Sequence, residues 1–387
     1  MKVARVLLFF VIVLAIYFLV NAYVLYRGVH CFPHGTAART IVFWTGLFLV
    51  LSFIVGRVLE RFWLSHVSDV FVWIGSFWLG AMLYLFLAVV LIDLVRLVHA
   101  VVPFLPDSWL ERPDRTARMA FWIVTGLVGV LLVAGHLNAR TPRVRHLTMQ
   151  ISKSVPGVDS VRIAMTSDIH LGTLVGRKRL ERIAEIISEA RPDLVLFPGD
   201  IVDEDLAPVI KENLGETLRS ITAPMGVFGI TGNHEYIGGV EEAVAYLEEH
   251  GIRMLRDTCI ILRGGITLCG REDRSSMQFG GLRRKGLGEL LKDVDRTRPV
   301  IMMDHQPFDL DSVAKAGVDV QLSGHTHHGQ LWPLNYITKV VYEQSWGYLR
   351  KSGTQFYVSS GAGSWGPPVR LGNRPEIIVL TLHFTNQ

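Results

Sequence analysis

Five short polar segments of the sequence combine residue types that bind metal ions. They are Asp168-Ile169-His170, Gly199-Asp200, Gly232-Asn233-His234-Glu235, Asp304-His305 and Gly324-His325-Thr326-His327. Together they offer carboxylate oxygens, an amide oxygen and several imidazoles, but no cysteine thiolate. This donor set suits Mn, Fe or Zn and argues against a structural zinc held by cysteines. The sequence therefore predicts a metal centre built from oxygen and nitrogen ligands.

The spacing within these segments supports that prediction. Residues two apart in an extended chain project to the same side, so Asp168 with His170, and His325 with His327, can each offer a pair of ligands. Three of the segments also contain a glycine, which permits unusual dihedral angles and close backbone approach beside an ion.

Each polar segment begins one or two residues after the end of a short apolar run. The runs are 161–166, 194–197, 227–231, 300–303 and 318–322, and two further strands are expected at 355–359 and 377–383. Amphipathic stretches at 180–190, 240–250 and 282–294 predict helices between them. Such a β/α rhythm brings the carboxyl ends of several strands to one crevice. We therefore expect an α/β globular domain in which the five segments converge.

The first part of the chain has a different composition. Residues 1–137 hold 16 of the 74 charged residues of the 387-residue chain. Four stretches in it carry no charge: 6–26, 40–56, 70–92 and 119–139. Since about 20 apolar residues cross a bilayer as a helix, each is long enough or nearly long enough to span a membrane. The sequence predicts a membrane region over 1–139 with four helices, a basic linker over 140–157 and a globular domain over 158–387.

The distribution of charged residues bears on the membrane orientation of the chain and on what its two parts can bind. Lys and Arg are nearly equal on the two sides of the predicted spans, and the basic residues beside the first and last spans favour a cytoplasmic globular domain. The spans are poor in ionisable groups, which favours anchorage over transport. Beyond residue 137 the chain has 29 basic and 29 acidic residues, so no basic surface for nucleic acid is expected.

The three cysteines do not form a disulfide framework. Cys259 and Cys269 flank an expected hairpin turn at Gly264-Gly265 and could approach each other, whereas Cys31 lies among the apolar segments. Reduced, packed cysteines are the favoured interpretation.

The order of the five segments, with Gly199-Asp200-Ile201-Val202-Asp203 as the second, resembles the calcineurin-like metallophosphoesterases over residues 158–387. The resemblance implies a β-sandwich flanked by helices and two divalent metal ions, with Mn favoured and Fe or Zn as alternatives. By position, the first ion would be bound by Asp168, His170, Asp200 and His327, and the second by Asp200, Asn233, His305 and His325. His234 would lie beside the leaving oxygen, with Asp203 orienting its ring.

The activity implied is hydrolysis of a phosphodiester or pyrophosphate bond by a hydroxide that bridges the two ions. Glu204 and Asp205 stand where protein phosphatases of this superfamily carry Arg-Gly, and two acids would repel the phosphate of a phosphoprotein. A phosphoprotein substrate is therefore disfavoured.

The segments around His325 to Pro333 and Tyr357 to Gly361 look like the membrane-associated branch of this family. Four spans favour a phosphate ester that is amphiphilic or lipid-linked. Its second phosphate could be held by Arg271, Arg274, Arg283, Arg284 and Lys285, and the alternative is that these residues form a solvated face. The alternatives are a UDP-2,3-diacylglucosamine pyrophosphatase of lipid A synthesis, a membrane sensor that binds metal or nucleotide without catalysis, and a transporter with a regulatory domain.

Overall fold

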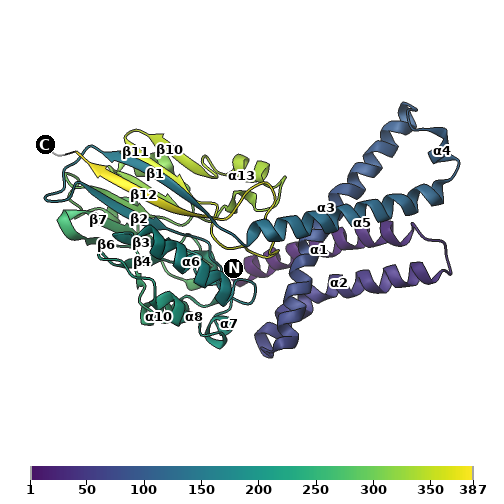
Figure 1. Cartoon of the computed structure of the whole chain (residues 1–387), viewed down its shortest axis with the longest axis horizontal. Coiled ribbons are helices and arrows are strands. Elements are labelled where there is room, and N and C mark those ends of the chain that lie inside the picture. Colours follow the sequence, from purple (N-terminus) through teal and green to yellow (C-terminus); the bar gives the residue numbers. More distant parts are fainter. Residues whose placement is uncertain (1, 386–387) are drawn as a thin grey trace. The chain divides into compact units, whose positions relative to one another are not determined.

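The computed structural model describes residues 2–385 and divides the chain into two compact units (Figure 1). The first comprises the chain up to His136 together with Gly366–Val369, and the second comprises Leu137–Trp365 with the chain from Arg370 onward.

The first unit is helical. Its helices are α1 (Lys2–Val29), α2 (Ala37–Phe62), α3 (His66–Val101), the short α4 (Asp107–Leu110) and α5 (Pro113–Ala139), whose last three residues belong to the second unit. The four long helices are long and apolar enough to cross a membrane. Helices α2 and α3 pack closely because Gly75 has no side chain, since a Cβ there would lie 2.3 Å from the Cα of Phe53. Asp93 pairs with Arg27 and accepts a hydrogen bond from Tyr23, so the charges of this ion pair are neutralised within the unit.

The second unit contains two six-stranded sheets. The first has the order β1 (Arg143–Ile151), β12 (Glu376–Phe384), β2 (Ser160–Met165), β3 (Leu194–Pro198), β4 (Val227–Ile230) and β5 (Arg253–Met254). The second has the order β10 (Gly347–Lys351), β11 (Thr354–Val358), β9 (Val320–Ser323), β8 (Val300–Met303), β7 (Thr267–Gly270) and β6 (Thr258–Ile261). Strands β2 to β5 are parallel, as are β7, β8, β9 and β11.

A hydrophobic core joins the two sheets face to face. Ile163 and Leu196 of the first sheet pack in one cluster with Ile301 and Leu322 of the second. The outer face of the first sheet is covered by α6 (Arg177–Ala190), α8 (Leu214–Arg219) and α10 (Val240–Glu249), and that of the second by α11 (Leu287–Leu290) and α12 (Leu310–Lys315). The remaining short helices are α7 (Ala207–Lys211), α9 (Asn233–Gly238) and α13 (Asn335–Val341). The expected β-sandwich flanked by helices is confirmed.

Two segments differ from the sequence expectation. Residues 140–157, expected to be a linker, contain β1, which pairs with β12 over nine residues. Only Met149 and Ile151 of this strand are buried, so its exposed basic residues conceal the alternation typical of a strand. The helix expected over 282–294 is reduced to the single turn α11, because Gly286 and Gly288 weaken helix formation there.

The cysteine pair also differs from the favoured interpretation. Cys259 and Cys269 form a disulfide, because β6 and β7 are antiparallel and their register sets the two residues directly opposite each other. The intervening turn contains Gly264 and Gly265, both with positive φ, as the hairpin requires.

Candidate metal centre

The candidate ligands lie just beyond the carboxyl ends of five parallel strands. Asp168 and His170 follow β2, Asp200 follows β3, Asn233 begins α9 after β4, His305 follows β8, and His325 and His327 follow β9. Main-chain hydrogen bonds tie these loops together, from the N–H of Asp168 to Gly199 O (3.1 Å) and from the N–H of His170 to Asp200 O (3.1 Å). The expected convergence of the five segments is thus present in the structure.

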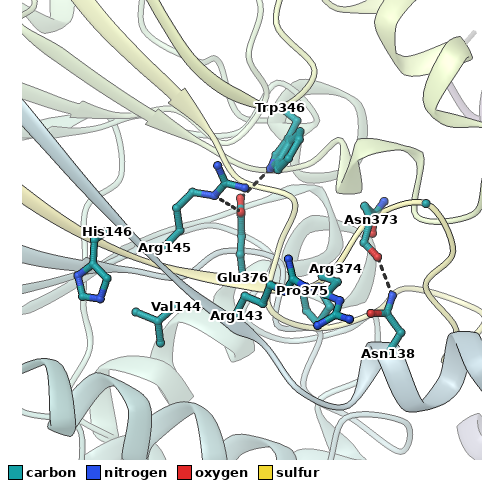
Figure 2. Close-up of a pocket in the computed structure, with 11 residues that line it drawn as sticks. Asn138, Arg143, Val144, Arg145, His146, Trp346, Asn373, Arg374, Pro375 and Glu376 are labelled. Atoms are coloured by element: carbon teal, nitrogen blue, oxygen red, sulfur yellow. Dashed lines mark hydrogen bonds and ion pairs between the residues drawn. The ribbon is translucent and has the colours of Figure 1, made fainter.

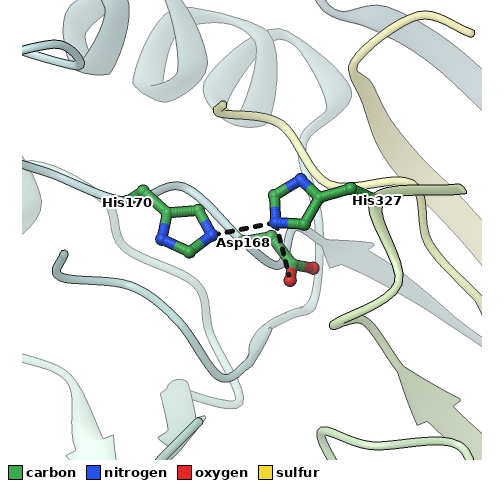
Figure 3. A group of neighbouring side chains, drawn as sticks. All are labelled: Asp168, His170 and His327. Atoms are coloured by element: carbon green, nitrogen blue, oxygen red, sulfur yellow. Dashed lines mark hydrogen bonds and ion pairs between the residues drawn. The ribbon is translucent and has the colours of Figure 1, made fainter. Parts of the chain in front are cut away.

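One group of side chains consists of Asp168, His170 and His327 (Figure 3). The Nε2 atoms of His170 and His327 are 3.0 Å apart, and His327 Nε2 is 3.6 Å from Asp168 Oδ1. All three residues are buried.

A second group consists of Asp200, His305 and His325. Asp200 Oδ2 lies 3.1 Å from His305 Nε2 and 3.7 Å from His170 Nε2, so this carboxylate reaches both groups. Asn233 Oδ1 lies 2.8 Å from His325 Nδ1 and 3.3 Å from His305 Nε2. The amide therefore joins the second group without adding charge.

Many of these residues hold a backbone conformation that is costly for a side chain. Positive φ angles occur at Asp168 (51°), His170 (53°), Asp200 (52°), His325 (72°) and His327 (45°). A non-glycine residue in a sparsely populated region costs about 1–3 kcal/mol, and such residues cluster at functional sites. The surrounding fold therefore holds these side chains inward at the expense of stability.

The charges of the site fit bound cations. Asp168 is fully buried, burial raises its pKa, and its Oδ2 has no hydrogen-bond donor among residues 2–385. Burial, with His170 and Arg370 nearby, holds the pKa of His327 well below its usual value, so its ring is neutral. A neutral imidazole and an unpartnered carboxylate oxygen are the forms in which these groups bind metal.

His234 belongs to neither of these two groups, but it forms a third group of possible metal ligands with His170 and Asp203. Its Nδ1 is 3.0 Å from Asp203 Oδ1, and its main-chain N–H donates to Asp200 Oδ1 (3.0 Å). Burial alone would lower the pKa of His234, but the Asp200, Asp203 and Glu204 carboxylates outweigh it and raise the pKa to about 9. The carboxylate of Asp203 thus orients the ring, as a carboxylate behind a catalytic histidine does.

Two positioning residues were not predicted from the sequence. Glu235 ends the segment Gly232-Asn233-His234-Glu235, and its buried carboxylate accepts four main-chain N–H groups, from Asp200, Ile201, Val202 and Gly232. Arg370 is fully buried, donates to Ser360 O and Gly363 O, and lies with Nη2 3.1 Å from His327 Nδ1. The motif pointed to Glu235, but no pattern in the sequence marked Arg370.

The arginines expected at the substrate lie in different surroundings. Arg271 is buried and its Nη1 pairs with Asp304 Oδ2 at 3.1 Å, directly before His305 in the chain. Arg274 pairs with the exposed Asp309 and lies over the Phe308 ring. Arg284, also among the basic residues that the sequence offers for a second phosphate, shares the Asp304 carboxylate with Arg271 and lies 2.5 Å from it.

Comparison with known proteins identifies the family to which the chain is similar. The model of the calcineurin-like phosphoesterase family matches residues 161–329, which contain all seven candidate ligands. An uncharacterized metallophosphoesterase of Aquifex aeolicus is 31% identical over 258 residues, covering 66% of this chain and 97% of the relative. One from Campylobacter jejuni is 28% identical over 97% of this chain and 98% of the relative.

A further relative, from Danio rerio, is named as a transmembrane protein with metallophosphoesterase domain and is 31% identical over 66% of this chain. The chain spans 61% of the length of that relative and of a Helicobacter pylori metallophosphoesterase. The chain therefore belongs to the calcineurin-like metallophosphoesterase family. This family implies hydrolysis of phosphoesters with divalent metal ions, and the four apolar helices together with the transmembrane-named relative indicate a membrane protein.

Proposed function

We propose that the chain is a membrane-anchored, metal-dependent phosphodiesterase or pyrophosphatase that acts on an amphiphilic or nucleotide-linked substrate. The proposal rests on one observation. Side chains of the metal-binding type from five strand ends lie close together, and the His234–Asp203 pair lies beside them. In this proposal Asp168, His170, Asp200 and His327 hold one ion, and Asp200, Asn233, His305 and His325 hold the other. Two divalent ions, Mn by preference, would supply Lewis acidity and an activated water for phosphoryl transfer.

The proposed task of His234 is to protonate the leaving oxygen. Its Nδ1 faces Asp203 Oδ1, so the proton available for transfer is at Nε2. The hydrogen bond from the main-chain N–H of His234 to Asp200 Oδ1 keeps the ring at the edge of the ligand groups. Asp203 is thus a positioning residue that acts through His234.

The surface beside His234 favours a substrate with an apolar part. The Trp365 ring contacts the His234 ring edge to face, with ring centres 5.8 Å apart. Half of the Trp365 surface remains exposed. An exposed indole next to the proposed proton donor offers contact area to an acyl or other apolar group close to the reacting phosphate.

The arginines beside His305 favour a second phosphate. Arg271 and Arg284 share one carboxylate oxygen of Asp304, so one negative charge faces two guanidiniums. Buried N–H groups of both arginines, Nε of Arg271 and Nε and Nη1 of Arg284, have no hydrogen-bond acceptor within residues 2–385. An oxyanion would satisfy these donors. A diphosphate combined with acyl chains is the chemistry of UDP-2,3-diacylglucosamine, which is therefore the narrower candidate substrate.

The experiment is a Mn(II)-supplemented activity panel on the detergent-purified full-length chain. It compares UDP-2,3-diacylglucosamine, phospholipids, cyclic nucleotides and phosphomonoesters, with Asp200→Asn as the background. We expect diesters or diphosphates to be hydrolysed faster than monoesters. Turnover of monoesters alone would contradict the proposal, and bound metal without turnover of any substrate would favour a sensor.

A matched pair of variants tests the second phosphate. Arg284→Gln should raise the KM for a diphosphate about tenfold, as loss of a charge-assisted contact does, and leave the KM for bis(p-nitrophenyl) phosphate unchanged. Arg283→Gln is the control, because Arg283 is exposed and pairs with Glu289. An equal change in the KM for a diphosphate in both variants would contradict the proposed binding of a second phosphate by Arg284.

A further inference from the structure

A cavity unrelated to the candidate metal ligands lies at the start of the second unit (Figure 2). Its volume is about 690 Å³, within the range of small-ligand sites. It is lined by the first residues of β1, the segment 372–376 and Trp346. Its lining includes three arginines, Arg143, Arg145 and Arg374, and a single acid, Glu376.

Both carboxylate oxygens of Glu376 have partners, and Glu376 forms an ion pair with only one of the three arginines. Glu376 is buried, and its Oε1 accepts from Trp346 Nε1 (3.0 Å), from Tyr357 OH (3.1 Å) and from the N–H of Ser360 (3.0 Å). Its Oε2 lies 3.2 Å from Arg145 Nε, and the Arg145 guanidinium stacks 4.8 Å above the Trp346 ring. This arrangement of Arg145, Glu376 and Trp346 is visible in Figure 2.

The other two arginines are uncompensated. Within residues 2–385, the side chains of Arg143 and Arg374 make no hydrogen bond or ion pair, and both are exposed to the cavity. Arg143 and Arg145 are two apart on β1 and therefore project to the same side. Arg374 is held near them because the N–H of Arg143 donates to Pro375 O at 2.8 Å. Guanidiniums collected without a counter-charge match the planar, bidentate geometry of a phosphate.

The covalent chain fixes where this cavity lies. Arg143 comes four residues after Ala139, the last residue of the fourth candidate span α5, so its Cα lies within about 14 Å of the end of that helix. The side chain of Asn138 donates to Arg370 O (2.9 Å) and Asn373 O (2.7 Å), which brings the segment before β12 to the same place. The length of the chain between Ala139 and Arg143 therefore keeps Arg143 within reach of lipid headgroups at the end of α5.

We propose that this cavity binds the phosphate of an anionic membrane lipid from the leaflet in which α5 ends. Arg143 and Arg374 hold the phosphate oxygens, while Arg145 remains bound to Glu376. Basic residues directly beside a span attract anionic lipids, and a cavity of this size adds a site for a single headgroup. This site is distinct from the candidate metal centre, and the proposal does not depend on the proposed hydrolysis.

The test measures lipid retained by the full-length protein in detergent micelles. Labelled phosphatidylglycerol or phosphatidylcholine is added, the protein is washed, and bound lipid is counted for wild type, for Arg143→Gln/Arg374→Gln and for Arg263→Gln/Lys292→Gln. The last variant is the control, because it removes the same charge from exposed positions outside the cavity.

We expect wild type and the control variant to retain phosphatidylglycerol over phosphatidylcholine, and the Arg143/Arg374 variant to lose this retention by about tenfold or more. Equal retention by all three proteins overturns the proposal. A second arm adds inorganic phosphate to the lipid-loaded protein. If millimolar phosphate binds through Arg143 and Arg374 and phosphatidylglycerol does not compete, the occupant is free phosphate and the lipid assignment fails.

Discussion

The carboxylate of Glu235 accepts the main-chain N–H of Asp200, with Oε2 3.1 Å from the nitrogen. The same oxygen accepts the N–H of Gly232 at 2.7 Å, and Oε1 accepts those of Ile201 and Val202. Glu235 therefore joins the loop after β4 to the loop after β3, and it sets the distance between Asn233 and Asp200. A carboxylate is needed because both of its oxygens must act only as acceptors.

Glu235→Gln should destabilise the globular unit. The amide retains one acceptor oxygen, but its NH2 group faces two N–H donors in a buried site, which costs about 2–4 kcal/mol. Thermal unfolding should show a midpoint lower by about 5 °C or more. The exposed Glu242→Gln is the control and should leave the midpoint unchanged. Equal midpoints for the two variants would show that Glu235 does not hold the loops.

Asp200→Asn should remove most hydrolysis of bis(p-nitrophenyl) phosphate. The variant keeps the shape of the side chain but loses the charge that lies 3.1 Å from His305 and 3.7 Å from His170. Turnover should fall by about 100-fold or more, because a residue shared by both ligand groups is lost. Asp293→Asn is the matched control, because Asp293 is exposed and its side chain makes no hydrogen bond or ion pair within residues 2–385. Unchanged turnover in Asp200→Asn would refute the shared role.

His234→Asn should lower turnover and keep the metal content. His234 lies beside the ligand groups and is oriented by Asp203, so its loss removes proton transfer, worth about 10²–10⁴ in rate. Metal analysis of the purified variant distinguishes a histidine that transfers a proton from one that binds a metal ion. Loss of both ions together with activity would mean that His234 is itself a ligand.

Mn(II) should raise the thermal midpoint of the full-length protein. Asp168 is buried with an oxygen that has no donor within residues 2–385, so a cation that binds the folded state removes an unfavourable charge. At 100 times its Kd, a ligand adds about 2.7 kcal/mol to the free energy of unfolding. The midpoint should return to its starting value after chelation with EDTA, and Asp168→Asn should show a much smaller shift. Identical shifts in both proteins would exclude Asp168 as a ligand.

The residue pattern was sufficient to predict an α/β domain and the convergence of the ligand segments, whereas the sandwich was predicted from the family resemblance. Buried parallel strands such as β3 and β8 consist of apolar residues throughout, and their length and flanking residues distinguish them from helices. Because each strand ends at a polar segment, the topology alone brings Asp200 and His305 to one place.

Other features depend on contacts between distant parts of the chain. Strand β1 exists because Arg143 to Ile151 pair with β12, which lies more than 200 residues later, and not because of its own pattern. Likewise, the place of the buried Arg370 beside the site depends on its Nη2 lying 3.1 Å from His327 Nδ1, 43 residues earlier in the chain. Neither contact leaves a periodic signal in the sequence.

The disulfide between Cys259 and Cys269 leads to the last prediction. It closes a hairpin of about ten residues, which is worth about 3 kcal/mol by the chain-entropy argument. Stable disulfides form in oxidising compartments, whereas the Lys and Arg count beside the spans favours a cytoplasmic globular domain. Alkylation with a maleimide polymer in denaturant, directly after cell lysis, decides between these arguments. We expect one adduct, at Cys31, before reduction and three after it. Three adducts without reduction would mean that the pair is open in the cell and that the domain faces a reducing compartment.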